Sequence, residues 1–412
     1  MDLWAPFPPA RRRQLVALLT TPPRSLDELT RLRAQMSGRL VALTALEALC
    51  ADEPGFAGRL FGRVIPSIFA HARALLDGDD DPTLRIHTPG KAQRTVLSRR
   101  DVAGWVAHMA LGTLPDLGML HPDIDLAPLL QGEAPSQRAK LRCVLAYFDR
   151  TLEAPPAGRF IVERLVSTPR TLLEWSGDAS PLTPLIVDAK GTIEDAALHL
   201  QVDFANEYLG GGVLRRGCVQ EEIRFSVAPE LLAAMILSPR MLPEEAIVMR
   251  GSERFAASRG YAEHFEYAGG FRDPSPRLAD GSVDVDFVAI DAVDYRRGDP
   301  KAQYRDDAML RELAKARAGF ARDKRNLPVA TGNWGAGAFR GDPSLKAVLQ
   351  WLAASSEGRA VRYCTFGDAR VDGIHRFAGE APGRFNSVGA LWNKLRAVID
   401  DGAPGLFERL LP

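Results

Sequence analysis

Apolar residues up to about position 180 recur at the spacing of helix faces. In the stretch 136–153, Leu141, Val144, Leu145 and Phe148 fall on one face, because residues three and four apart are neighbours on a helical surface. The pattern predicts that this first part of the chain is helical.

Two helix starts in this part carry a capping signal. Ser25 and Ser98 each stand before a helical run and have an acidic residue three positions later, Glu28 and Asp101. A serine at the N-cap accepts a hydrogen bond from a backbone N–H of the first turn, and an acid three residues on fits the same motif. We therefore expect helices to begin at these serines.

Beyond about residue 180 the apolar pattern changes to the alternation that is typical of strands. Leu198, Leu200, Val202 and Phe204 stand at alternate positions. Further strands are predicted at 246–250, 285–293, 327–331 and 361–366, and helices at 229–237, 309–322 and 342–355. Strands that alternate with helices predict an α/β domain with a mixed sheet covered on both faces.

Length and composition fit a globular protein of more than one domain. The chain has 412 residues, of which 46% are hydrophobic and 25% are charged, so it can build a large core. Lys and Arg number 52, as do Asp and Glu, and this balance argues against nucleic-acid binding through bulk charge.

Other composition signals restrict the location and the chemistry. The four cysteines lie far apart without a CxxC pair, which argues against a zinc cluster and a disulfide framework. The seven histidines show no metal-ligand spacing, so we expect neither a metal nor another cofactor. No signal peptide is evident, and no apolar run approaches the roughly 20 residues of a membrane span. We expect a soluble intracellular monomer.

The residues best suited to chemistry follow the predicted strand at 198–206. They are Asp203, Asn206, Gly210, Gly211, Gly212, Gln220, Glu221 and Glu222. Three glycines let backbone amides approach a ligand, Asn206 can bond a sugar hydroxyl, and a glutamate in a poorly solvated pocket can act as a general acid. The alternative is an ordinary glycine turn before a helix whose first turn carries acids.

A second glycine-rich loop at 331–342 stands between a predicted strand and a predicted helix with Asp342 as its N-cap. Its amides and the helix N-terminus can face phosphates. It lacks the Lys-Ser/Thr of a P-loop and the GxGxxG fingerprint. A ligand-free turn is the alternative, and Trp334 and Phe339 either fill core or shape a nucleotide pocket. Tyr261, which follows a glycine, either closes over a ligand or packs, with packing favoured when it is taken alone.

Taken in chain order, these segments resemble the poly(ADP-ribose) glycohydrolase family. The family signature, three glycines followed by Gln-Glu-Glu, stands here as GGGVLRRGCVQEE at 210–222. Other segments follow in the order of the family: 191–195, 200–206, 221–232, 260–263, 288–292, 329–339 and 363–368. The stretches RDVAGWVAHMALGTLP and QRAKLRCVLAYFDR resemble the helical accessory domain of its longer, eukaryote-type members. The similarity covers about residues 90–370.

The resemblance implies a macrodomain-like catalytic domain at 181–412, preceded by an all-α accessory domain at 1–180. It implies glycoside hydrolysis of poly(ADP-ribose), free or on modified proteins, with ADP-ribose as product and without direct contact to nucleic acid or membrane. It also implies roles for single residues. Glu222 would be the catalytic acid, and Glu221 and Asn206 would hold ribose. The residues that would wrap the diphosphate are Gly335, Ala336, Gly337, Ala338 and Phe339, and Asn333 would be a further substrate-binding residue. Ile193 and Glu194 would meet the adenine, with Phe366 stacking near the adenosine end. Tyr261 would clasp the ligand, and Gln220 would help to position the loop and the substrate.

The phosphate loop departs from the family at two positions. Ala336 stands where the family commonly has Cys, and Arg340 where it commonly has Gly. Because the loop acts through its backbone, Ala336 should be harmless, whereas Arg340 would either assist phosphate binding or narrow the pocket.

Three other functions stay open at this point. The first is a reader that binds ADP-ribose without cleaving it, although a reader would not need the glutamate pair. The second is a hydrolase of protein-linked mono-ADP-ribose. The third is a nucleotide-binding transferase, which is disfavoured because no phosphate-handling Lys follows the glycines.

Overall fold

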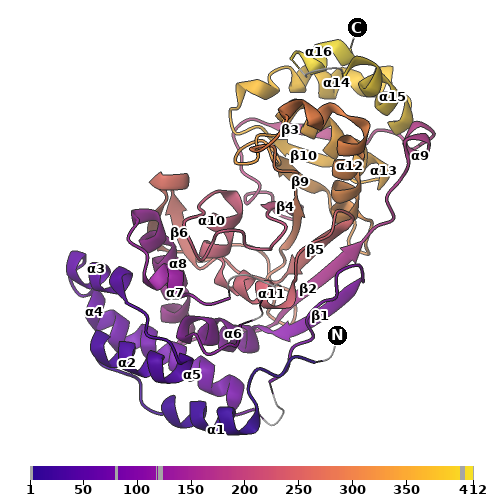
Figure 1. Cartoon of the computed structure of the whole chain (residues 1–412). Helices are drawn as coiled ribbons and strands as arrows, with labels where there is room; N and C mark the ends of the chain where they lie inside the picture. The colour runs from indigo at the N-terminus through magenta and orange to yellow at the C-terminus, as the bar shows by residue number, and fades with distance from the viewer. Residues whose placement is uncertain (1–2, 79–81, 117, 119–123, 400–403, 412) are drawn as a thin grey trace.

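The computed structural model describes residues 3–78, 82–116, 118, 124–399 and 404–411. The molecule is elongated, with the amino-terminal helices at one end, the carboxyl-terminal helices at the other and a sheet running between them (Figure 1).

The amino-terminal part is built from helices around their own apolar core. These helices are α1 (Pro9–Leu18), α2 (Leu26–Ser37), α3 (Thr44–Asp52), α4 (Phe56–Arg59), α5 (Ile65–Leu76), α6 (Arg99–Leu111), α7 (Ala127–Leu130) and α8 (Pro135–Thr151). The two predicted caps are confirmed, because Ser25 accepts from the N–H of Glu28 and Ser98 from that of Asp101.

One mixed sheet of eight strands runs through the molecule. The sequence predicts a mixed sheet and five of these strands. In spatial order the strands are β1 (Gln93–Ser98), β2 (Arg159–Val166), β5 (Glu245–Arg250), β8 (Asp286–Asp291), β4 (Leu200–Ala205), β9 (Val329–Gly332), β10 (Val361–Cys364) and β3 (Leu185–Asp188). The first four pair antiparallel, and β8, β4, β9, β10 and β3 run parallel. Every strand predicted from the alternating pattern is present.

Strands β1 and β2 belong to the first 180 residues and were not predicted. In β2 the side chains of Phe160, Val162 and Arg164 are buried in alternation, whereas β1 is half exposed along its length. The helical segment therefore contributes two strands to the sheet. It also shares a core with the remaining strands, so the boundary near residue 180 stays a prediction.

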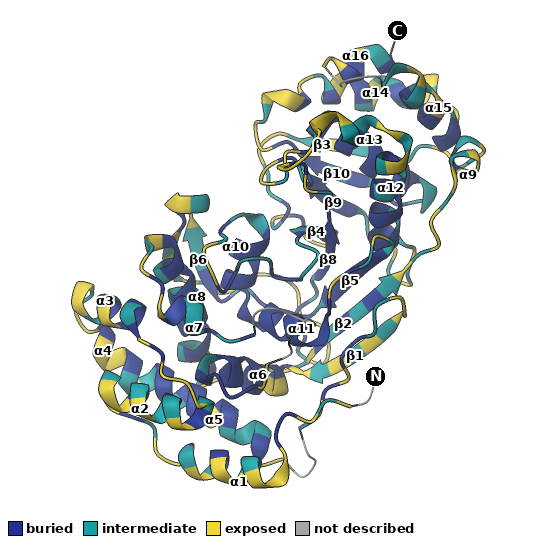
Figure 2. Ribbon diagram, viewed as in Figure 1, coloured by how far each residue is buried: buried dark blue, intermediate teal, exposed yellow. Residues whose placement is uncertain are grey.

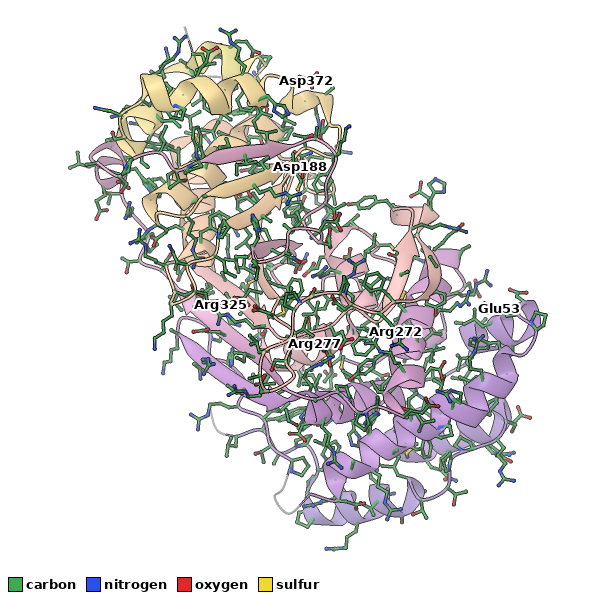
Figure 3. The ribbon with its side chains drawn as sticks, turned by 180° about the vertical axis from the view of Figure 1, so that it is seen from behind. Glu53, Asp188, Arg272, Arg277, Arg325 and Asp372 are labelled. Atoms are coloured by element: carbon green, nitrogen blue, oxygen red, sulfur yellow. The ribbon has the colours of Figure 1, made fainter. Side chains whose placement is uncertain are left out.

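The sheet is buried on both faces, which Figure 2 shows for its central strands. Along β5, Ile247 and Met249 pack with the amino-terminal helices, while Ala246 and Val248 pack with helices on the other face. Seen from behind in Figure 3, side chains fill the space between the strands and the helices, and Asp188 marks the end of β3.

The remaining elements complete the two layers. They are α9 (Leu172–Ser176), α10 (Gln220–Val227), α11 (Leu232–Leu237), α12 (Asp306–Phe320), α13 (Pro343–Ser356), α14 (Ile374–Arg384), α15 (Val388–Val398), α16 (Leu406–Leu410) and the hairpin of β6 (Ala256–Arg259) with β7 (Glu266–Gly270). The predicted cap of α13 is confirmed, since Asp342 accepts from the N–H groups of Ser344 and Leu345. In the described part of the chain, no helix has the length and apolar character that crossing a membrane requires.

Candidate active site

A cavity of about 880 Å³ lies at the carboxyl ends of the parallel strands. Asn206 follows β4, Ala292 follows β8, Asn333 follows β9 and Phe366 stands two residues after β10, and all four line the cavity. Parallel strands bring their carboxyl ends to one edge, where ligands of open α/β sheets commonly bind. The fold therefore gathers loops that are distant in sequence into one site.

The cavity brings together most of the residues expected from the sequence. Those that line it are Glu194, Asn206, Gln220, Glu221, Glu222, Tyr261, Asn333, Gly335, Gly337, Ala338, Phe339 and Phe366. Ile193, Asp203, Gly210, Gly211, Gly212 and Ala336 are not among its lining residues. The second set lies behind the first, as the following contacts show for the glycines and Asp203.

The cavity opens where two strands separate. Strands β4 and β9 pair only at Leu200 and Gln201 of β4. Further along β4, Gln220 takes the place of the missing strand: its Oε1 accepts from the N–H of Phe204 at 2.8 Å, and its Nε2 donates to the carbonyl of Val202 at 3.2 Å. Gln220 thus satisfies the free backbone groups of β4 and fixes the start of α10 at the cavity wall.

Glu221 and Glu222 lie in the first turn of α10, and both are buried. Glu221 accepts from the N–H groups of Gly210 at 2.7 Å and Asn206 at 2.9 Å. Glu222 accepts from those of Gly212 at 2.9 Å and Val219 at 2.8 Å. Each carboxyl group is therefore fixed by two backbone donors, at the helix end where the dipole favours negative charge.

The glycine turn provides hydrogen-bond donors and space for the two glutamate side chains. The N–H groups of Gly210 and Gly212 donate to the two carboxyl groups, and Gly210 and Gly211 have φ of 85° and 51°, which glycine adopts readily. A Cβ on Gly211 would lie 2.6 Å from Oε2 of Glu221 and 2.7 Å from Oε1 of Glu222. Only glycine leaves room for both carboxyl groups at this point.

A third carboxyl group is buried within β4. Asp203 is 2% exposed, and neither of its oxygens has a hydrogen-bond partner among the described residues. Burial raises the pKa of Asp203 to about 8, although the charge of Arg224 opposes the shift. Burial, followed by the charges of Asp203 and Glu222, raises the pKa of Glu221 well above its usual value. Burial thus favours the neutral forms of Asp203 and Glu221.

The second glycine loop forms another part of the cavity wall. Asn333 is held by the hydroxyl of Tyr363, which donates to its Oδ1 at 2.8 Å, and donates in turn to the carbonyl of Thr365 at 3.1 Å. Gly335 has a φ of 69°. Trp334 is fully buried, and its Nε1 donates to the carbonyl of Ile290 at 2.9 Å, so its ring anchors the loop to the core.

Arg340 stays outside this wall. Its side chain is exposed, and it is not a lining residue of the cavity. Its φ of 58° lies in the left-handed region, which explains why glycine would suit this position.

Two aromatic residues lie at the cavity with unusual exposure. Tyr261 is 54% exposed and Phe366 is 48% exposed, and both line the cavity. Ordinary core packing would bury these rings, so their position fits contact with a ligand better than packing.

Sequence reasoning missed four arginines of the lining, Arg224, Arg254, Arg296 and Arg370, of which the last two lie beside the second glycine loop. Arg296 follows β8, forms an ion pair with Asp294 and lies over the ring of Phe339 at 5.4 Å. Arg370 follows β10 and donates to the carbonyl of Ala336 at 3.2 Å. Their position a few residues after predicted strands was the signal that would have found them. Both guanidinium groups lie beside the second glycine loop, and Arg370, like Arg296, also forms an ion pair, with Asp368 at 2.6 Å.

Comparison with known proteins identifies relatives over most of the chain. The model of a family described as poly(ADP-ribose) glycohydrolase, macro domain fold, matches residues 172–373. A second model, described as the helical domain of poly(ADP-ribose) glycohydrolase, matches residues 54–164.

Individual relatives agree with these models. Poly(ADP-ribose) glycohydrolase 1 of Arabidopsis thaliana is 33% identical over 373 residues, which cover 72% of this chain and 67% of the relative. Probable poly(ADP-ribose) glycohydrolase 2 of the same plant is 30% identical over 410 residues, covering 81% of this chain and 77% of the relative. Poly(ADP-ribose) glycohydrolase 2 of Caenorhabditis elegans is 37% identical over 252 residues, covering 56% and 51%.

Proposed function

The chain belongs to the poly(ADP-ribose) glycohydrolase family, and we propose that it hydrolyses the ribose–ribose O-glycosidic bonds of poly(ADP-ribose) and releases ADP-ribose. The observation that carries the proposal is the pair of buried glutamates, each held by two backbone N–H groups, in the wall of a large cavity. A protein that only binds ADP-ribose has no need of such a pair.

We assign the chemistry to Glu222. In its protonated form it donates to the leaving ribose oxygen while an oxocarbenium-like centre develops, and the same carboxylate then activates the attacking water. General acid–base help of this kind contributes about 10²–10⁴-fold in rate. The diphosphate of the substrate stabilises the cation, which removes the need for the second, nucleophilic carboxylate of many glycosidases.

The other lining residues would bind the substrate. We propose that Glu221 and Asn206 hold ribose hydroxyls, that the loop from Gly335 to Phe339 wraps the diphosphate and that Tyr261 closes over the ligand. Glu194 and Phe366 would contact the adenosine, with Ile193 behind them in a small apolar cluster. Arg296 and Arg370 add the cations that a diphosphate attracts.

We also propose that the chain acts as an intracellular monomer on free polymer and on poly(ADP-ribosyl)ated proteins. The four free cysteines are compatible with a reducing compartment. The formal net charge of +0 supports the absence of direct nucleic-acid binding.

The test compares the wild-type protein with Glu222→Gln on purified poly(ADP-ribose), with product sizes followed over time. We expect the wild type to release ADP-ribose and the variant to be essentially inactive, with calorimetric ADP-ribose affinity close to that of the wild type. Full activity of Glu222→Gln would refute the assignment. A wild type that binds ADP-ribose without cleaving polymer would be a reader, and one that cleaves only mono-modified protein would be a different hydrolase.

Glu221→Gln is the matched control. Each glutamate accepts from two backbone N–H groups, so each amide variant turns one NH2 group toward a donor and loses comparable stability. If Glu222 is the acid, its variant loses far more of kcat than the Glu221 variant at equal loss of Tm. If both variants lost kcat equally, the data would refute our assignment of different roles to the two residues, with Glu222 as the acid and Glu221 as a ribose-binding residue.

A further inference from the structure

Lys140 of α8 places a buried ammonium group beneath the glycine loop. The residue is 0% exposed, and its Nζ donates to the carbonyls of Val213 and Arg215, both at 2.8 Å, to that of Gly217 and, at 3.4 Å, to that of Gly212. Within the described residues it forms no ion pair, and the four acceptors of its ammonium group are backbone carbonyls of this one loop.

The same loop binds the glutamates with its N–H groups. Gly212 donates its N–H to Glu222, and its carbonyl accepts from Lys140. Carbonyls on one side of the turn therefore converge on an ammonium group, and N–H groups on the other side point to carboxyl groups. In a low-dielectric interior, hydrogen bonds arranged in such a chain polarise and strengthen one another.

If packing were the only requirement at this position, burying a lysine would be energetically unfavourable. Burying an ammonium group costs free energy unless several acceptors replace its water, and a buried apolar residue avoids that cost. The four carbonyls provide that replacement, and they do so only while the turn from Gly212 to Gly217 keeps its present shape. The contact therefore specifies the conformation of the loop.

We propose that Lys140 is a positioning residue for hydrolysis: through the carbonyls of residues 212–217 it fixes the loop that holds Glu222, so that the helical segment takes part in catalysis. The inference rests on the proposed function. It gives the helical segment a role that requires no contact with substrate.

The first test is Lys140→Met, which keeps the unbranched side chain up to the Cε position and removes the ammonium group with its charge and donors. A misplacement of about 1 Å can cost about 10²-fold in rate, so we expect kcat on poly(ADP-ribose) to fall about 10- to 100-fold. ADP-ribose affinity, measured by calorimetry, should change by less than about threefold, because the diphosphate and adenosine contacts belong to other loops. An unchanged kcat would overturn the inference, and so would equal losses of kcat and affinity.

Lys315→Met is the control for buried lysines in general. Lys315 of α12 is also 0% exposed; it forms an ion pair with Asp291 at 2.6 Å and donates to the carbonyls of Leu242 and Glu245, at 2.6 Å each. Neither residue lines the cavity, and neither does Lys315. We expect this variant to lose Tm at least as strongly while its kcat stays within about threefold of the wild type. An equal fall of kcat in both variants would reduce Lys140 to a structural residue.

A pH profile decides the matter if Lys140→Met does not fold. Burial lowers the pKa of Lys140 to about 8, and Cys218 and Glu222, the titratable groups that face it, oppose this shift. As pH rises through about 8, Lys140 loses a donor and its charge, so kcat of the wild type should fall. Burial raises the pKa of the Cys218 thiol to about 11, above this range.

The direction of this effect separates it from unfolding. An unfolded lysine keeps its proton to about pH 10.5, so between about pH 8 and 10.5 the unfolded state binds more protons and this group makes the fold more stable as pH rises. Lys140→Arg keeps its proton throughout, and the fall of kcat should move to higher pH. An unchanged profile would overturn the inference, whereas a wild type inactive on polymer would refute the proposed function itself.

Discussion

Glu221 and Glu222 are neighbours in the sequence, yet their surroundings differ. Glu221 faces the buried carboxyl group of Asp203, and burial together with that charge raises the pKa of Glu221. Glu222 faces the turn that Lys140 holds. Three carboxyl groups in so little water cannot all carry charge without cost, and Asp203, which has no hydrogen-bond partner among the described residues, is the natural one to stay neutral.

Asp203→Asn tests this distribution of charge. Because the folded pKa of Asp203 is raised from 3.8 to about 8, wild-type stability from this group is complete below about pH 4 and is lost as pH rises through about 8. Asparagine does not titrate, so the variant should not lose this stability and should be the more stable protein near pH 8. Between about pH 4 and 8, the free energy of unfolding of the wild type should fall relative to the variant by up to about 1.4 kcal/mol per pH unit. Thermal unfolding measured from pH 4 to 9 checks this. A stability difference that does not change with pH would contradict the raised pKa.

At the scale of elements, the site depends on the glycine turn at 210–217 and on helix α10, which hold each other in position through hydrogen bonds. Helix α10 begins with Gln220 bonded to β4, and its two glutamates accept from the preceding turn. The turn owes its shape to glycines, two of which have positive φ, and to Lys140 on α8. Distortion of the turn therefore moves the carboxyl groups even where the helix itself is unchanged.

Gly211→Ala should abolish activity. The new Cβ would collide with carboxyl oxygens of both glutamates, at 2.6 and 2.7 Å, so the turn must shift, and we expect hydrolysis to fall at least about 10²-fold. Gly38→Ala is the matched control, since Gly38 has a φ of 72° and its added Cβ meets nothing within 4 Å. It should cost about 1–2 kcal/mol of stability and no activity. Polymer assays and denaturant unfolding of both variants give the comparison, and normal activity of Gly211→Ala would show that the turn adapts.

At the scale of the whole molecule, the helical segment and the sheet share one hydrophobic core. Residues such as Phe148 and Val162 share a core with Leu232 and Ile247. Buried ion pairs add to this core, because Arg99 of α6 binds Glu230 and Glu253. We therefore propose that the two predicted domains, 1–180 and 181–412, depend on each other for folding.

Expression of residues 181–412 alone tests this dependence. The fragment lacks β1 and β2 and exposes the apolar side of β5 and α11, so we expect an aggregated or poorly packed product without activity. Co-expression with residues 1–180 should restore a soluble complex, and the full chain should unfold in one calorimetric transition. A fragment that folds cooperatively and cleaves polymer would refute the proposal.

The sequence by itself determined several local elements and indicated twelve of the residues that line the cavity. Helix starts at Ser25, Ser98 and Asp342 and the strands around Val202 and Val288 follow from nearest-neighbour patterns, because caps and side-chain alternation depend on residues a few positions apart. The glycine and glutamate signature at 210–222 is also a short stretch of sequence, so it could indicate the cavity wall and the family without knowledge of the fold.

Tertiary structure alone decided what those residues do to one another. The amides of Gly210 and Gly212 turned out to bind glutamates, because α10 packs against their turn. Lys140 looked like any charged residue of a helix, and its partners lie 72 to 77 positions away. No local pattern encodes such a contact. It exists because the sheet and α8 enclose the turn, which leaves a lysine and several carbonyls without water and with only each other to bond.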